Sequence, residues 1–225
     1  MITNLKKVQM LPAREQVASI LRSSILSGEI CKGQSITLDS IGEQVGMSRT
    51  PVREAFHILA SEGLLELRQN RCAIVKGISL DAIRDHYDMR ILLETEAVRR
   101  ACHNIDAHTL HAIKEISKEG ENAKKAGNIE AYNLANQAFH MAIWEAAGSE
   151  KLKSFLSLLW NGVSMNRRIT AEEYATFSQA EHATIVEKMV KGDYEGACST
   201  MRNHIIHSMN SMLVNFSQDE HGSKA

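Results

Sequence analysis

The segment Ser48–Gly63, with the sequence SRTPVREAFHILASEG, is the stretch that most constrains how this chain can fold. Ser48 or Thr50 can cap the start of a helix, and Pro51 fits a first helical turn because its missing N–H is not needed there. Gly63 is the kind of residue at which helices end. Apolar residues then follow the i, i+4, i+7, i+8 spacing of one buried helix face: Val52, Phe56, Leu59 and Ala60. The segment therefore predicts an amphipathic helix that lies on a core.

Three polar side chains at the start of this predicted helix point away from its apolar face: Arg49, Thr50 and Arg53. Two guanidinium groups at the positive end of a helix suit DNA phosphates and the edges of guanine bases. An ordinary solvated helix end has the same composition, so the flanking segments decide between the two interpretations.

Those flanking segments place the helix in a larger motif. Leu38–Val45 has the pattern of a short amphipathic helix, and Gly46-Met47-Ser48 predicts the tight turn of a helix-turn-helix. Arg14–Ser27 predicts an earlier helix. Two β-prone runs on either side of an expected wing tip follow Gly63: Leu64–Arg68 and Cys72–Lys76, with Gln69-Asn70-Arg71 between them. This order predicts a winged helix-turn-helix within residues 1–77.

The motifs SRTPVREA at Ser48–Ala55 and EGLL at Glu62–Leu65, with the strand-wing-strand pattern after them, resemble the DNA-binding domain of the GntR family of bacterial transcription regulators. The resemblance implies a double-stranded DNA operator, contacted by Arg49, Thr50, Arg53 and, at the wing, Arg71. The wing tip reads Asn70-Arg71-Cys72, where the family often has glycine. Asp39 stands where some members carry a DNA-contacting arginine, which implies a different operator preference.

Charge is distributed unevenly along the 225 residues. The net charge is −1, but residues 1–77 carry +3 and the remainder −4, which fits DNA binding at one end only. No stretch approaches the ~18 apolar residues of a membrane span, and the start MITNLKKVQM lacks the apolar core of a signal peptide. A cytoplasmic protein is therefore expected. The four cysteines show no C-x-x-C spacing and are predicted to be buried thiols.

The residues after Gly77 have a helix-favouring composition, with no proline beyond Pro51. Capping residues and glycines divide this region into six predicted helices. Their expected spans are 79–102, 106–127, 128–148, 149–168, 173–191 and 193–216. Residues 78–225 are therefore expected to form an all-α bundle of six to seven helices, and the chain as a whole to be mostly α.

Short motifs in this second region resemble the FadR C-terminal, or FCD, ligand-sensing domain, which follows one branch of GntR modules. They occur in order over about residues 80–212: Arg90-x-x-Leu93-Glu94, Asn136-x-x-Phe139-His140, Glu181-His182 and Met201-Arg202-Asn203-His204. The resemblance implies a helical domain that senses a small molecule. Effectors in the wider family are mostly organic acids, sugar acids or fatty-acyl groups.

His140, His182 and His204 lie on three separate predicted helices. Imidazoles that converge from three helices can bind one divalent transition metal. Asn136 precedes His140 by four residues, so both side chains lie on one helix face. Metal-binding FCD domains usually carry aspartate there, and the neutral amide of Asn136 is a weaker ligand. Three of 10 histidines on helices are also compatible with ordinary packing, but the resemblance favours a metal site, with zinc or nickel as the expected ion.

Arg90 is the candidate anchor for a small carboxylate effector, because a guanidinium fork matches a carboxylate. The alternative is an ion pair within the helix, since Glu94 follows at i+4. Spacing alone favours neither role.

The leading interpretation is an effector-responsive regulator, more often a repressor, that binds a palindromic operator as a homodimer. A metal-dependent enzyme with a three-histidine site is the alternative. The sequence shows no Asp or Glu patterned beside the three histidines, so such an enzyme would lack an obvious general base, and the winged module would have no role. A third possibility is that the helical half only dimerises.

Overall fold

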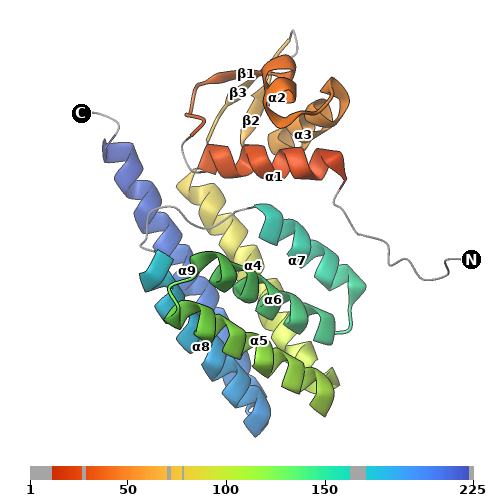
Figure 1. The fold of residues 1–225 in the computed structure, drawn as a ribbon, viewed down its shortest axis with the longest axis vertical. Helices are drawn as coiled ribbons and strands as arrows, with labels where there is room; N and C mark the ends of the chain where they lie inside the picture. The colour runs from red at the N-terminus through yellow and green to blue at the C-terminus, as the bar shows by residue number, and fades with distance from the viewer. Residues whose placement is uncertain (1–11, 27–28, 70–71, 78, 163–170, 223–225) are drawn as a thin grey trace, which may run out of the picture. The chain divides into compact units, whose positions relative to one another are not determined.

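The computed structural model describes residues 12–26, 29–69, 72–77, 79–162 and 171–222 (Figure 1). These residues form two compact units, the second of which begins at Ser79. Helices dominate, which confirms the predicted fold class. Among the described residues, no helix is long and apolar enough to cross a membrane.

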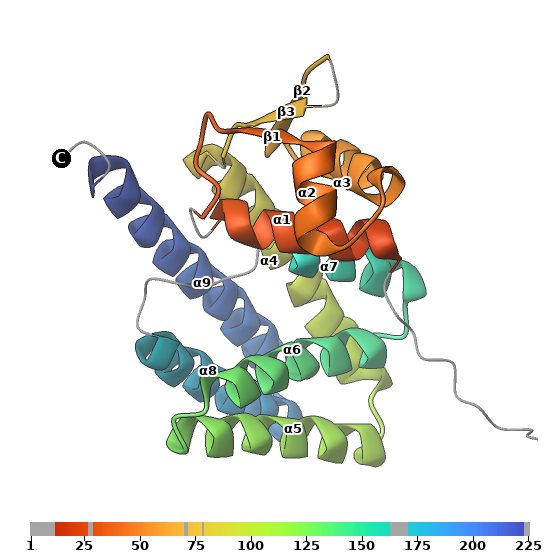
Figure 2. The same cartoon turned by 45° about the horizontal axis from the view of Figure 1, so that its top comes forward.

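The first unit is a winged helix-turn-helix, as predicted (Figure 2). Its three strands form an antiparallel sheet in the order β1-β3-β2, and Ile36 and Leu67 both lie opposite Ala73. Its elements are α1 (Ala13–Leu26), β1 (Ser35–Thr37), α2 (Leu38–Val45), α3 (Arg49–Ser61), β2 (Leu65–Leu67) and β3 (Cys72–Val75). Strand β1 was not expected, because three residues with a single buried side chain are too short to show a period of two.

The turn between α2 and α3 is tight because of two glycines. Gly46 adopts a left-handed conformation with φ 66°, which ends α2. A Cβ atom on Gly42 would lie 2.8 Å from the carbonyl oxygen of Met47, so only glycine allows this close approach. Thr37 caps α2 through a hydrogen bond that its hydroxyl accepts from the Ser40 amide at 3.1 Å. Ser48 stands at the N-cap of α3, but its hydroxyl makes no capping hydrogen bond to the described chain.

The core of the first unit is apolar and contains one ion pair at its edge. The predicted buried face of α3 is confirmed at three of four positions, while Ala55 is buried and Ala60 only partly so. Buried residues from α1, α2 and α3 complete this core: Val17, Leu21, Ile41, Val52, Phe56 and Leu59. The buried Arg22 donates from Nε to Glu62 Oε2 at 2.8 Å, which ties α1 to the residue after α3.

The second unit consists of six helices in the part of the chain that the structure describes, as predicted. They are α4 (Leu80–Asn104), α5 (Ala107–Lys125), α6 (Ile129–Ala146), α7 (Glu150–Gly162), α8 (Ala171–Lys191) and α9 (Tyr194–Gly222). Ser79, Asp106 and Asn128 cap α4, α5 and α6 with side-chain oxygens that accept backbone N–H groups. The expected end of the fourth helix, at Arg168, lies outside the described residues.

The bundle of the second unit has a partly polar interior. Helix α4 packs against α6 and α9, α5 packs against α6 and α8, and α8 packs against α9 (Figure 1). Its apolar core includes Tyr87, Phe139, Trp144, Met201 and Ile205. Ionisable and amide side chains are buried beside them: Arg90, Glu94, Asn136, His140, His182 and His204. Buried polar groups are costly unless they are paired, so this cluster marks a site.

The cysteines only partly follow the expectation. All four lie in the described chain, and none of them forms a disulfide there. Cys102 is buried, whereas Cys31 is exposed. The prediction of buried thiols was therefore right for Cys102 and wrong for Cys31, while Cys72 and Cys198 are only partly buried.

Candidate metal centre and DNA-binding surface

The three predicted histidines meet inside the bundle. His140 on α6, His182 on α8 and His204 on α9 are each about fully buried, and their ligand atoms lie within 4.8 Å of one another. The Nε2 atom of His204 lies 3.3 Å from Nε2 of His140 and 3.4 Å from Nε2 of His182. Two nitrogens bound at about 2.1 Å around a tetrahedral ion are separated by about 3.4 Å. The spacing of these nitrogens therefore matches a metal centre.

Two glutamates hold the other nitrogens of this group. The Nδ1 atom of His140 contacts Glu94 Oε2, and the Nδ1 atom of His204 lies 2.8 Å from Glu181 Oε2. Because an ionised carboxylate only accepts, each Nδ1 carries the proton and donates it. The Nε2 atoms of His140 and His204 then face each other with lone pairs, and the Nε2 atom of His182 lies beside them. Such an arrangement of acceptors is favourable when a cation lies between them.

The prediction that no Asp or Glu stands beside the three histidines was wrong. Glu94 comes from α4, and Glu181 precedes His182 but reaches across to His204 on α9. Neither contact follows from a fixed spacing along the chain, because each joins two different helices. Both glutamates stand within the short motifs noted in the sequence, and that was the signal available for them.

Burial sets the protonation of this centre. Burial lowers the pKa of His182 well below 6.5, and it also lowers the pKa of His140 although Glu94 acts in the opposite direction. Burial acts to raise the pKa of Glu94, but Arg90 and His140 outweigh it and hold that pKa far below its ordinary value. At neutral pH His140 and His182 are therefore neutral imidazoles beside the ionised Glu94, which is the state that binds a cation.

Asn136 lies on α6, one turn before His140, and only 9% of it is exposed. Its amide oxygen Oδ1 is buried and has no hydrogen-bond partner among the described residues. A buried carbonyl oxygen without a partner is costly. A metal ion at the histidines would give this oxygen something to bind, so the residue fits the predicted role of fourth ligand.

Arg90 forms the ion pair that was the alternative to an effector contact. Its Nε and Nη2 atoms donate to Glu94 Oε1 at 2.8 and 2.6 Å, and both side chains are buried. Its guanidinium also lies 5.4 Å from the ring centre of Tyr87 and 5.1 Å from that of Trp160. Glu94 thus joins Arg90 to His140, and the Nη1 group of Arg90 is not used by this pair.

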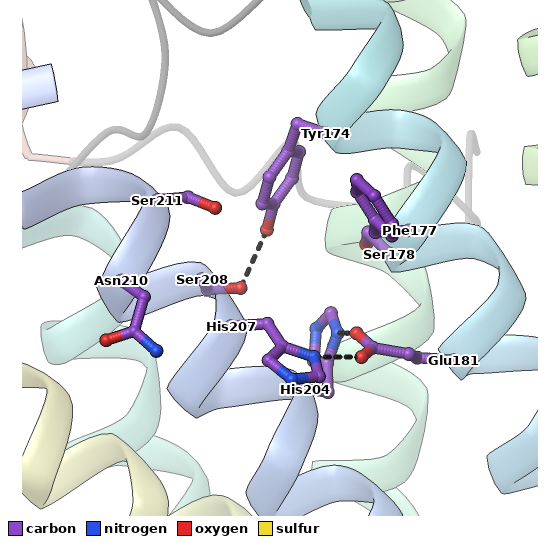
Figure 3. A pocket seen from close by; sticks show the side chains of 9 residues that line it. All are labelled: Tyr174, Phe177, Ser178, Glu181, His204, His207, Ser208, Asn210 and Ser211. Carbon is purple, nitrogen blue, oxygen red and sulfur yellow. Dashed lines mark hydrogen bonds and ion pairs between the residues drawn. The ribbon is translucent and has the colours of Figure 1, made fainter. Parts of the chain in front are cut away.

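A pocket of about 280 Å³ opens between α8 and α9, on the outer side of Glu181 (Figure 3). Glu181 accepts a hydrogen bond from His204 at one carboxylate oxygen and from His207 at the other (Figure 3). The Tyr174 hydroxyl lies 3.0 Å from Ser208 Oγ across the pocket. The pocket thus reaches a residue that orients the histidine centre. His207 is exposed, and its bond to Glu181 joins α9 to α8, so no spacing within one helix could have predicted it.

The predicted DNA-contacting residues of α3 lie on the surface of the first unit. Arg49, Thr50 and Arg53 are all exposed at the start of the helix. Arg49 is paired with Asp39 in the first turn of α2. Arg71, the expected wing contact, lies outside the described residues.

A winged helix-turn-helix followed by a helical bundle with a buried histidine centre is the architecture of a two-domain transcription regulator. The family model described as "Bacterial regulatory proteins, gntR family" matches residues 13–75, and that of the FCD domain matches residues 85–207. The chain belongs to the GntR family of transcriptional regulators, in the group with an FCD domain. It is a regulator and not an enzyme, so the alternative of a three-histidine enzyme was wrong.

Relatives and solved structures agree with this assignment. The gluconate operon transcriptional repressor of Bacillus subtilis is 34% identical over 151 residues, which cover 66% of this chain and 59% of that protein. The structure of E. coli McbR/YncC superposes with a TM-score of 0.73 at 21% identity and covers 92% of this chain and 100% of its own. The Zn²⁺-bound FCD domain of TM0439 has a TM-score of 0.52 at 22% identity, with coverage of 62% and 97%.

Proposed function

We propose that this regulator is a repressor that binds a palindromic operator as a homodimer. Residues 1–77 would read the DNA through Arg49, Thr50 and Arg53, with Arg71 as a wing contact, and residues 78–225 would sense an effector and dimerise. The exposure of the three α3 side chains supports this role, as does a relative named as a repressor. A two-fold operator requires two recognition helices about one DNA turn apart, which a dimer supplies.

The helical unit would bind one divalent transition metal, zinc or nickel, through His140, His182 and His204, with Asn136 as the fourth protein ligand. The observation that carries this proposal is the convergence of three Nε2 atoms while two Nδ1 atoms are held by glutamates. The FCD domain of TM0439 has been solved with Zn²⁺. When bound, the ion would supply Lewis acidity, and an oxygen ligand would enter either by displacing the weakly bound amide of Asn136 or by taking a fifth position.

The effector would be a small organic acid. A carboxylate suits an open metal position, and the pocket beside Glu181 has room for a molecule of that size. Arg90 would be a second anchor for the carboxylate through the Nη1 group, which Glu94 does not engage.

The test combines metal analysis with ligand binding on untagged full-length protein. We expect one zinc or nickel ion per chain after loading. In a thermal-shift screen, small organic acids should raise the melting temperature of metal-loaded protein more than that of chelator-treated protein, since a ligand of the folded state stabilises it. The same acid should weaken the gel shift of DNA from the protein's own promoter. His111→Ala, an exposed α5 histidine, is the control.

Other outcomes would contradict separate parts of the proposal. Protein that takes up no ion and melts at one temperature with or without zinc, nickel and manganese would exclude the metal. Acids that bind but strengthen the gel shift would exclude a simple repressor. A monomer in analytical ultracentrifugation at micromolar concentration, with and without operator, would exclude the homodimer.

A further inference from the structure

The side chain of Arg49 is held by a carboxylate within the proposed DNA-binding surface. Arg49 is the first residue of α3, and Asp39 lies in the first turn of α2. The Nε group of Arg49 donates to Asp39 Oδ1, and Nη2 donates to Asp39 Oδ2 at 2.9 Å. The guanidinium and the carboxylate are thus joined by two parallel hydrogen bonds, which fix the direction of the guanidinium plane as well as its position.

Stability does not account for this pair. The side chains of Arg49 and Asp39 are 54% and 57% exposed, so water surrounds both. Exposed ion pairs contribute little to folding because solvent screens them and two side chains lose their freedom. The pair therefore matters chiefly for how it arranges the side chains of the DNA-binding surface.

The donors that Asp39 leaves available are those that read a guanine. A guanidinium has five N–H groups, and Asp39 accepts from Nε and from one N–H of Nη2. The edge formed by Nη1 and Nη2 keeps three N–H groups and lies away from the carboxylate. A bidentate contact to O6 and N7 of guanine requires two neighbouring N–H groups of this kind. Asp39 thus occupies one edge of the fork and leaves the other edge for a base.

The negative charge of Asp39 also favours contact of Arg49 with a base over contact with phosphates. A carboxylate beside Arg49 cancels its long-range attraction for phosphates, on which binding to DNA of any sequence depends. A negative group in this position also disfavours close approach of the phosphate backbone. The pair therefore weakens the general attraction of Arg49 for DNA while it retains the contact that depends on a base.

We propose that Asp39 is a positioning residue that sets operator specificity by orienting Arg49 toward one guanine in each half-site. This inference rests on the proposed contact between Arg49 and DNA, and goes beyond it by giving the neighbouring carboxylate a role. A side chain that never touches the base would thus decide how strictly that base is required.

The experiment is selection from a randomised double-stranded DNA library with full-length wild type, Asp39→Ala, Asp39→Asn and Arg49→Ala. Affinities are then measured for the wild-type consensus, for each single-base variant of it and for an unrelated duplex, at about 50 and 200 mM salt. Melting temperatures are recorded for all four proteins, and Asp81→Ala, an exposed acid that pairs with Arg84 in α4, is the matched control.

We expect Asp39→Ala to lose discrimination at one base pair per half-site, by about fivefold or more. Its affinity for the unrelated duplex should rise, because a negative charge is gone from the surface. Asp39→Asn, which keeps one acceptor oxygen, should fall between it and wild type. Arg49→Ala should lose the same base preference, and all melting temperatures should stay close to that of wild type.

Three outcomes would overturn the inference. Unchanged base preference in Asp39→Ala, with preference lost in Arg49→Ala, would remove the role of Asp39 and leave the Arg49 contact standing. Unchanged preference in Arg49→Ala would remove the proposed contact itself. A uniform gain in affinity of Asp39→Ala for every sequence would show that Asp39 only competes with phosphates.

Discussion

Two arginine–carboxylate pairs, one in each unit, show how surroundings change the effect of the same chemical contact. Asp39 holds Arg49 on the surface, where both side chains are more than half exposed. Glu94 holds Arg90 in the bundle, where the exposed fractions are 0% and 5%. An exposed pair contributes about 0–1 kcal/mol, but the loss of one partner from a buried pair costs about 3–5 kcal/mol. The first pair directs a side chain, and the second neutralises charge inside the core.

The proposed DNA-binding surface and the histidine centre also differ in burial. The DNA-contacting candidates are neighbours in sequence on one exposed helix end. The candidate metal centre is buried, and its proposed ligands and their supporting glutamates come from α4, α6, α8 and α9. Substitutions in the first region should alter binding alone, whereas substitutions in the second should alter binding and folding together.

The largest effect is expected for His182→Ala, which removes one of three converging nitrogens. Metal affinity should fall by more than the roughly 10–100-fold that loss of a supporting residue costs, so no stoichiometric ion should remain after dialysis. Metal analysis of untagged protein measures this. His111→Ala should retain one ion per chain, and an equal metal content in both variants would refute the site.

Glu94→Gln should have the next largest effect, because it leaves Arg90 buried without a counter-charge. The free energy of unfolding should fall by about 3–5 kcal/mol, as measured by denaturant titration in the presence of chelator. Glu96→Gln on the same helix is the matched control, since Glu96 pairs with Arg99 and Arg100 near the surface. Similar losses of unfolding free energy in the two variants would mean that the burial of the Arg90–Glu94 pair does not determine its contribution to stability.

Arg53→Ala should weaken operator binding without affecting folding. A bidentate guanine contact is worth about 1–3 kcal/mol of discrimination, and its loss should appear as weaker binding in a fluorescence titration with unchanged melting temperature. Arg84→Ala, an exposed arginine of α4, should bind DNA as wild type does. Undiminished binding by a double Arg49→Ala, Arg53→Ala variant would remove α3 from the reading role.

Acidification should destabilise the metal-free protein. His140 and His182 have lowered pKa values in the folded state, so the unfolded chain binds more protons below about 6.5. Their contribution is complete above that pH and is lost as the pH falls through 6.5 toward the folded pKa values. The slope should reach at most about 1.4 kcal/mol per pH unit for each histidine.

Denaturant titrations at pH 7, 6 and 5 in chelator measure this slope. His182→Leu should flatten it, because one of the two histidines is gone, whereas His111→Ala should not. An unfolding free energy that stays constant from pH 7 to pH 5 would contradict the assignment of buried neutral imidazoles.

Asp39→Asn should have the smallest effect on folding. Because the pair with Arg49 is exposed, its loss should change the unfolding free energy by less than about 1 kcal/mol. Parallel denaturant titrations of Asp39→Asn and Glu94→Gln compare the two pairs directly. If Asp39→Asn loses as much unfolding free energy as Glu94→Gln, the exposed pair and the buried pair do not differ in their effect on stability.

The sequence by itself determined the features that depend on neighbouring residues. Spacings of a few residues, which local backbone geometry fixes, predict several such features. They are the buried face of α3, the turn at Gly46, the caps at Ser79, Asp106 and Asn128, and the number of helices described in the second unit. Strand β1 escaped prediction because three residues carry too little pattern.

Only the tertiary structure decided what joins separate helices. The three histidines were recognised as a set through their motifs. The glutamates that orient them were not, because Glu94 is 46 residues from His140 in the chain and Glu181 is 23 residues from His204. Only the packing of the helices brings each pair into contact. The same holds for Arg49, whose exposure was predicted but whose bond to Asp39 depends on the angle between α2 and α3. Hydrogen bonds need atoms placed to within fractions of an ångström, and the hydrophobic pattern of a helix fixes only which face turns inward.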